Sequence, residues 1–170
     1  DQKNFKKLNN FYWFFSLDLK SSKKIAQQII SEWTEKNIKY NSKSWEFDIT
    51  SKRIISWLSN HSLTIEEANS NYLKIFNEMI QKQANHLIIE ANNSKTVDNK
   101  IVGCAAIILV GICYGEKNYL TYGLSLLKKI ANLSLDNHGF PKSRDIKQLI
   151  FYLKYFILIR EWFRESQIEI

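Results

Sequence analysis

"VDNKIVGCAAIILVGICYGEKN", residues 97–118, contains the least polar run of the chain and decides how the rest is interpreted. From Ile101 to Cys113 no side chain is charged or a strong hydrogen-bonding group. The apolar run up to Tyr114 has 14 residues, whereas a membrane span needs about 20. Charged residues border it on both sides: Asp98, Lys100, Glu116 and Lys117. We therefore predict the buried helix of a helical core, and no membrane span.

The composition is that of one mostly helical domain. The chain has 170 residues, 45% of them hydrophobic and 14% aromatic, which is enough for a core and argues against disorder. One proline and five glycines are too few for the many tight turns of an all-β fold. Long unbroken runs rich in Ile, Leu, Lys, Gln and Glu predict helix. We expect a single all-α domain over residues 1–170.

The charge balance leaves two explanations open. The net charge of +7 suits a polyanionic partner. It also suits a lysine-rich composition whose scattered lysines are solvated surface. No basic stripe with interleaved aromatic residues occurs, so we expect no nucleic-acid partner. In a chain that mostly uses lysine, arginine marks positions that need a planar fork; the four arginines are Arg53, Arg144, Arg160 and Arg164.

Seven helical segments are predicted, and no strand. Thr64 with Glu67 fits a capping box that opens the longest of them. The segments are Phe5 to Leu19, a helix through "IAQQIISEWTEKN" that Ser21 or Ser22 starts, "SKRIISWLSNH" capped by Asp48 or Thr50, Thr64 to about Ala91, 99–113 capped by Asp98, Tyr119 to Leu135, and 146–163 capped by Ser143.

Two kinds of helix alternate in the second half. Segments 64–91 and 119–135 are amphipathic, whereas 99–113 and 146–163 are apolar nearly all round and are therefore predicted to be buried on several sides. The connections are short, so neighbouring helices should be antiparallel. An outer helix paired with an inner helix, repeated, predicts helical hairpins in a partial α/α toroid. The N-terminal ends of the two inner helices should then open on the same side.

The first candidate site is "SWEFDITSKRIISWL". Trp45 is predicted in a loop, and Arg53 lies one helical turn before Trp57 on the same face. Tryptophan beside arginine at a helix start suits stacking on a sugar ring and pairing with a carboxylate. Tryptophans in the core with an arginine on the surface explain the same pattern, and both explanations stay open.

Two further helix starts are candidates. In "VDNKI", Asn99 can present its carboxamide at the mouth of the inner helix, or it can belong to a simple capping pair. In "NHGFPKSRDI", a rigid turn with the only proline leads into Ser143 and Arg144. A guanidinium fixed there can clamp an acidic group, or it can hold the turn as part of an ordinary helix N-terminus.

No pattern of metal ligands or other catalytic motif is present. His61, His86 and His138 are isolated, and none pairs with Cys or Glu at a metal-ligand spacing. The sequence lacks a phosphate loop, a nucleophile elbow and a dinucleotide fingerprint. Cys104 and Cys113 fall on opposite sides of one helix, so we expect two core thiols and no intrachain disulfide. No metal and no cofactor is expected in this chain.

In this order, the three stretches resemble the N-terminal helical domain of heparinase II/III-like proteins, in particular the alphaproteobacterial branch. The resemblance covers roughly residues 11–163. It rests on Trp33, Asn37, Trp45, Arg53, Ile54 and Trp57, on "DNKIVGCAAIILVGICYG" with Asn99 at the family asparagine, and on "HGFPKSRDIKQLIFYLKYFILIREWF" through Gly139, Ser143, Arg144 and Ile159-Arg160.

The resemblance implies an incomplete α/α toroid and a lyase function. Full family members carry more helices and a C-terminal β-sandwich domain, which we expect to be absent from this chain, and they cleave uronic-acid-containing polysaccharides by β-elimination. The family asparagine neutralises the uronate carboxylate, which makes Asn99 the catalytic candidate. The other groups of the reaction are a tyrosine of the toroid and a histidine of the second domain. The substrate-binding candidates are Arg144, Ser143, His138, Arg53, Trp45 and Trp57.

Departures from the family pattern predict binding without turnover. Lys100 stands where the family has histidine, His138 where it has aspartate, and Gln148-Leu149 where classical members have Tyr-His. We expect this chain alone to bind an acidic, uronate-containing polysaccharide and not to cleave it. The alternative is a non-catalytic helical scaffold that packs on a partner domain.

The beginning of the chain gives no compartment. The first residue is Asp1, and the residues that follow contain no cleavage signal for secretion. We expect a processed product or a fragment of a bacterial protein. Periplasm and cytoplasm both stay open.

Overall fold

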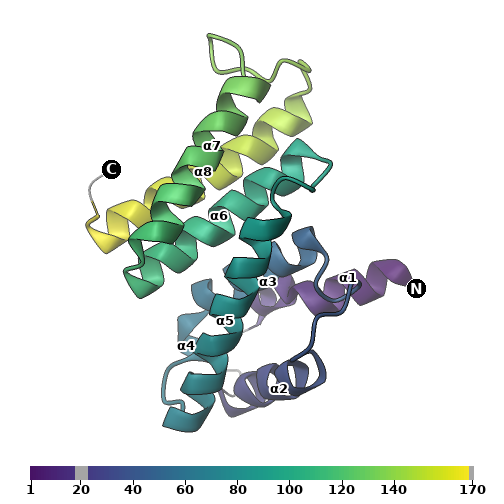
Figure 1. The fold of residues 1–170 in the computed structure, drawn as a ribbon, viewed down its shortest axis with the longest axis vertical. Helices are drawn as coiled ribbons and strands as arrows, with labels where there is room; N and C mark the ends of the chain where they lie inside the picture. The colour runs from purple at the N-terminus through teal and green to yellow at the C-terminus, as the bar shows by residue number, and fades with distance from the viewer. Residues whose placement is uncertain (18–22, 169–170) are drawn as a thin grey trace. The chain divides into compact units, whose positions relative to one another are not determined.

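The computed structural model describes residues 1–17 and 23–168, and within them the chain is all-α, as predicted (Figure 1). Eight α-helices and one 3-10 helix occur in these residues. Their only β-pairing is an isolated bridge between Leu135 and Pro141. The chain forms two compact units, Asp1–Ile88 (unit 1) and Ile89–Ile170 (unit 2).

Unit 1 is built around helix α3 (Phe47–Ser59). Nine of its 13 residues are buried. Helix α1 and the 3-10 helix pack on α3, and α5 reaches it through the rings of Trp57 and Phe76, whose centroids are 5.7 Å apart. The other elements are α1 (Gln2–Asn10), η1 (Tyr12–Ser16), α2 (Lys23–Lys36), α4 (His61–Thr64) and α5 (Ser70–Glu90).

The predicted helix from Phe5 to Leu19 is broken at Phe11. Phe11 adopts a left-handed φ of 58°, which ends α1 and starts η1. Its ring is 2% exposed, and its carbonyl oxygen accepts a hydrogen bond of 2.6 Å from the Ser56 hydroxyl. Burial of this ring against α3 therefore outweighs the local helical pattern. Leu19 lies outside the described residues, as do the predicted helix starts Ser21 and Ser22.

The predicted capping box at Thr64 is wrong. Thr64 is the last residue of α4, and its buried hydroxyl donates a 2.7 Å hydrogen bond to the Trp57 carbonyl oxygen instead of capping a helix. Glu67 has a left-handed φ of 60°, which no helical turn allows. Helix α5 begins only at Ser70, after this turn. The sequence pattern was correct about a long helix but placed its start six residues early.

Unit 2 is a three-helix arrangement in which α7 (Lys117–Ser134) and α8 (Ile146–Ser166) pack on α6 (Val97–Tyr114) (Figure 1). Every residue of α6 from Ile101 to Gly111 is buried, which confirms the prediction of a core helix. Its 18 residues have a mean hydropathy of 1.7, which is enough for a membrane span by length and composition. Core helices share this property, and 61% of the residues of α6 are buried. Cys104 is a core residue as predicted, whereas Cys113 is exposed.

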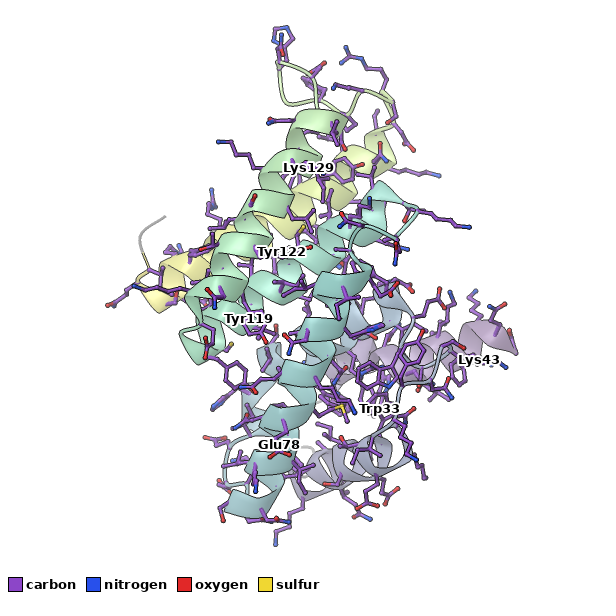
Figure 2. The ribbon with its side chains drawn as sticks, viewed as in Figure 1. Trp33, Lys43, Glu78, Tyr119, Tyr122 and Lys129 are labelled. Carbon is purple, nitrogen blue, oxygen red and sulfur yellow. The ribbon has the colours of Figure 1, made fainter. Side chains whose placement is uncertain are left out.

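Glycines let α6 and α7 approach closely. A Cβ atom on Gly123 would lie 2.6 Å from Cγ1 of Ile108, and one on Gly111 would lie 2.7 Å from Cγ of Leu120. Gly115, with a φ of 66°, ends α6 in the left-handed conformation that glycine adopts without strain. The side chains of Tyr119, Tyr122 and Lys129 mark the course of α7 (Figure 2).

Helix α8 is buried on one side only, contrary to the prediction of burial on several sides. Its inner face consists of Tyr152, Tyr155, Ile159, Trp162 and Phe163. Its outer face carries an exposed apolar line, here called the α8 stripe. The stripe consists of Ile146 (72% exposed), Ile150 (63%), Leu153 (46%) and Ile157 (50%).

Candidate functional site

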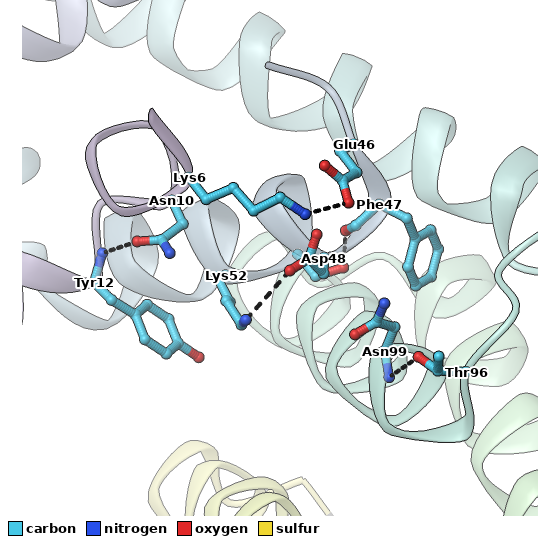
Figure 3. A network of polar contacts seen from close by, with 10 residues as sticks. Lys6, Asn10, Tyr12, Glu46, Phe47, Asp48, Lys52, Thr96 and Asn99 are labelled. Atoms are coloured by element: carbon cyan, nitrogen blue, oxygen red, sulfur yellow. Dashed lines mark hydrogen bonds and ion pairs between the residues drawn. The ribbon is translucent and has the colours of Figure 1, made fainter. Parts of the chain in front are cut away.

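Asn99 lies in the first turn of α6, and Thr96 rather than Asp98 is the N-cap of this helix. The Thr96 hydroxyl accepts a 3.3 Å hydrogen bond from the Asn99 backbone N–H (Figure 3). The Asn99 side chain is half-buried, and no group in the described part of the chain hydrogen-bonds its carboxamide. That carboxamide therefore has a donor and an acceptor available for a ligand.

A polar bridge joins the start of α6 to the start of α8. The Gln148 side chain donates a 3.1 Å hydrogen bond to the Asp98 carboxylate. The Gln148 side-chain oxygen in turn accepts a 2.6 Å hydrogen bond from the Ser143 hydroxyl. Asn99 and Ser143 are thus brought to neighbouring helix starts, with Gln148 between them.

Tyr152 lies one turn beyond Gln148 on α8, and its ring is 1% exposed. Burial, and then the nearby negative charge of Asp98, raise the pKa of its phenol to about 12. The hydroxyl is therefore protonated at neutral pH, and a proton-abstracting phenolate is not accessible there. The sequence analysis did not select Tyr152; an aromatic residue on an apolar helix gives no signal of a polar neighbour.

The turn before α8 is held by Asp136. Its carboxylate accepts backbone hydrogen bonds from His138 (2.9 Å) and Phe140 (3.0 Å) and forms a 2.6 Å ion pair with Arg144. The Phe140 hydrogen bond, followed by those of His138 and Arg144, lowers the pKa of this carboxyl group. Arg144 thus has the turn-holding role that the sequence left open, although 68% of its side chain is exposed.

Both helix starts are capped from within the chain. The Asp145 carboxylate accepts a 2.8 Å hydrogen bond from the Lys147 backbone N–H, so Asp145, not Ser143, is the N-cap of α8. The Thr96 hydroxyl occupies the amide of the third residue of α6. Each cap thus takes up one of the backbone amides that a helix start would offer to an anion.

The three candidates of unit 1 are core residues. Trp45 is 2% exposed, and Arg53 and Trp57 are fully buried. The Trp45 indole N–H donates to the Asn37 carbonyl oxygen (3.2 Å). In this structure they form no solvent-lined groove, and their placement supports a structural role rather than stacking on a sugar.

Arg53 is buried among neutral acceptors. Its Nε donates to the Gln83 side chain (2.7 Å), and its guanidinium carbon lies 3.9 Å from the ring centroid of Trp33 on α2, which Figure 2 labels. Three of the other four N–H donors bond the carbonyl oxygens of Asn9 (2.8 Å) and Ser44 (2.9 Å) and the Thr50 hydroxyl (3.2 Å). Burial lowers the pKa of this guanidinium, which stays charged at neutral pH.

No cluster of three or more potential metal ligands occurs among residues 1–17 and 23–168. No protein-family model, no curated protein and no solved structure matches the sequence. The arrangement of the side chains themselves therefore carries the functional argument.

Proposed function

We propose that this chain is a helical domain that binds an acidic, uronate-containing polysaccharide, as the N-terminal part of a heparinase II/III-like lyase. The observation that carries the proposal is the unpartnered carboxamide of Asn99 at a helix start. An amide N–H can donate to a uronate carboxylate, and this is the role that the resemblance gives to the asparagine. The paired helices of unit 2 suit the partial α/α toroid that the resemblance also implies.

The turn before α8 supplies further polar groups. The exposed Ser143 is bridged to its neighbourhood through Gln148, and His138 and Arg144 are exposed on the adjoining turn. A guanidinium that already pairs with Asp136 can still offer its outer N–H groups to a sulfate or carboxylate.

The same groups do not support turnover. β-Elimination needs a base for the C5 proton and an acid for the leaving oxygen O4. Tyr152, which lies one turn beyond Gln148 and interacts with Asp98, is buried, and the pKa of its phenol is raised to about 12. We therefore propose binding by this chain alone, with proton transfer left to groups outside it.

Titration calorimetry with oligosaccharides of heparan sulfate, hyaluronan and alginate tests this function. We expect binding to at least one of them, and a loss of about 1–3 kcal/mol in Asn99→Ala, as for a hydrogen bond to a charged group. Asn92→Ala, an exposed asparagine of the preceding loop, is the matched control and should bind normally. The ultraviolet absorbance of the unsaturated product should not rise. Equal affinity of the two variants would remove Asn99 from the site.

A second candidate function is a non-catalytic helical scaffold that packs on a partner domain. Two observations favour it. Trp45, Arg53 and Trp57 are core residues, and the α8 stripe is apolar and exposed. Exposed apolar surface of this kind marks interaction sites in soluble proteins. The scaffold candidate requires that the stripe, and not Asn99, be the binding surface.

A further inference from the structure

The α8 stripe has the spacing of a helix-packing seam. Its members follow one another at intervals of four, three and four residues: Ile146, Ile150, Leu153 and Ile157. This is the alternation of the a and d positions in a heptad, which packs one helix along another. At 1.5 Å per residue the stripe is about 16 Å long, or three helical turns. The opposite face of α8 is already buried in unit 2.

The stripe is also narrow. With 3.6 residues per turn, its four side chains point within about 60° of one another around the helix axis. Helices that face a protein core or lie in a membrane surface have a wider apolar face, of about 100° or more. A narrow line is what a second helix covers, because two helices touch along a line. This feature favours a helical partner over a lipid surface.

Charge around the stripe excludes a second copy as the favoured partner. Lys147 and Lys154 lie beside it, and Arg160 and Arg164 continue its line toward the C-terminus; all four are exposed. Glu161 is engaged by both arginines. A parallel pair of α8 helices would place each arginine against its own copy. An antiparallel pair with superposed stripes would bring Lys147 toward Lys154 of the other chain.

We infer that the α8 stripe docks an amphipathic helix whose apolar residues repeat at four-three-four spacing and are flanked by Asp or Glu. The apolar line of the partner covers Ile146 to Ile157. Its carboxylates face the cations along the edge and at the C-terminal end. This inference rests on the scaffold candidate and identifies the chemical class of the partner; it does not depend on Asn99.

Two synthetic peptides of about 21 residues, three heptads, test the inference. Both carry Ile and Leu at the seam positions; one has Glu at the flanking positions and the other has Lys. Fluorescence anisotropy with the whole chain should show the Glu peptide binding about tenfold more tightly at low salt, and the ratio should shrink at about 1 M salt. Lys147→Glu with Lys154→Glu should reverse the preference.

The apolar part is tested by Ile150→Ser with Ile157→Ser. Both side chains are exposed, so the fold should persist, and circular dichroism verifies it. Binding of the Glu peptide should weaken about tenfold or more. Ile38→Ser, an equally exposed isoleucine of unit 1, is the matched control and should change nothing.

Other results would overturn the inference in distinguishable ways. Equal binding of both peptides, or of neither, would exclude the acidic helix. Self-association by sedimentation that the two serine changes abolish would make a second copy the occupant. Stripe-dependent binding to vesicles of phosphatidylcholine and phosphatidylserine would make it a lipid surface. In these last two cases the stripe remains an interface; serine changes without effect in every assay would remove the scaffold candidate as well.

Discussion

A guanidinium is costly to bury, because all five of its N–H donors need acceptors once water is excluded. Arg53 finds neutral acceptors only, and these come from distant parts of unit 1: residues 9, 44 and 83 as well as Thr50 one turn away. The charge is not cancelled by a carboxylate but spread over these dipoles and the ring of Trp33. The stability of unit 1 should therefore depend on the planar fork and not on the charge alone.

Arg53→Lys tests this dependence. Lysine keeps the charge but cannot reach all the acceptors, so several buried polar groups lose their partners. We expect the free energy of unfolding to fall by about 2–4 kcal/mol, measured by urea denaturation. Lys24→Arg, the reverse substitution at an exposed position, is the control and should change the free energy of unfolding by less than about 0.5 kcal/mol. A similarly small effect of Arg53→Lys would contradict the proposed role of the fork.

The sequence showed part of this site. Arg53 was selected as a position that needs a fork, which is correct, but the fork was assigned to a ligand. The choice between ligand and core depends on residues far apart in sequence, so local pattern does not decide it. One signal was present: Gln83 lies among the apolar residues that α5 buries, and a polar residue there requires a polar partner.

The course of the helices was predicted well where the hydrophobic periodicity is strong. The N-cap residues and the exposed face of α8 were predicted poorly. Core helix α6 and amphipathic α7 agree with the predicted 99–113 and 119–135 within a few residues. The caps predicted at Asp98 and Ser143 each lie two residues from the observed N-cap, because several residues near each start can cap a helix. The exposure of the α8 stripe was missed because an exposed apolar line has the same composition as a core face.

Gly123→Ala tests the close contact between α6 and α7. Alanine normally stabilises a helix relative to glycine, but here its Cβ would lie 2.6 Å from Cγ1 of Ile108. We expect the overpacking to outweigh the helix propensity and to lower the free energy of unfolding by about 1 kcal/mol or more. Ser125→Ala, exposed on the same helix, should be neutral or slightly stabilising. A stabilised Gly123→Ala would show that the helices can move apart at no cost.

The turn between α7 and α8 should respond to acid through Asp136. The folded-state pKa of this carboxyl group lies below its ordinary value of 3.8, chiefly because the Phe140 amide donates to it. Its stabilising effect is therefore complete above the ordinary pKa and is lost as the pH falls through the lower, folded-state pKa. Relative to Asp136→Asn, the chain should be more stable at pH 7 and should lose that advantage below pH 3.8 in thermal melts. A difference independent of pH would exclude the carboxylate as the cause.

At the scale of the molecule, the division into two compact units predicts that damage stays local. Arg53→Lys should accelerate amide hydrogen exchange within residues 1–88, and Gly123→Ala within residues 89–170. In the unchanged chain, the slowest amides of unit 2 should be those of the buried middle of α6, from Val102 to Val110. Exchange measured by mass spectrometry on peptic fragments verifies both points. Equal acceleration throughout the chain in either variant would mean that the units unfold together.

The burial of α6 also imposes an order on biosynthesis. The two helices that cover it, α7 and α8, both follow it in the chain, so a ribosome releases this apolar segment before its cover has been made. At about 5–20 residues per second, the segment waits several seconds until Ser166 has been added. During that interval the segment is long and apolar enough for a membrane helix by length and composition, a property that core helices share. The speed of translation through residues 115–166 therefore sets how long this apolar segment stays without its cover.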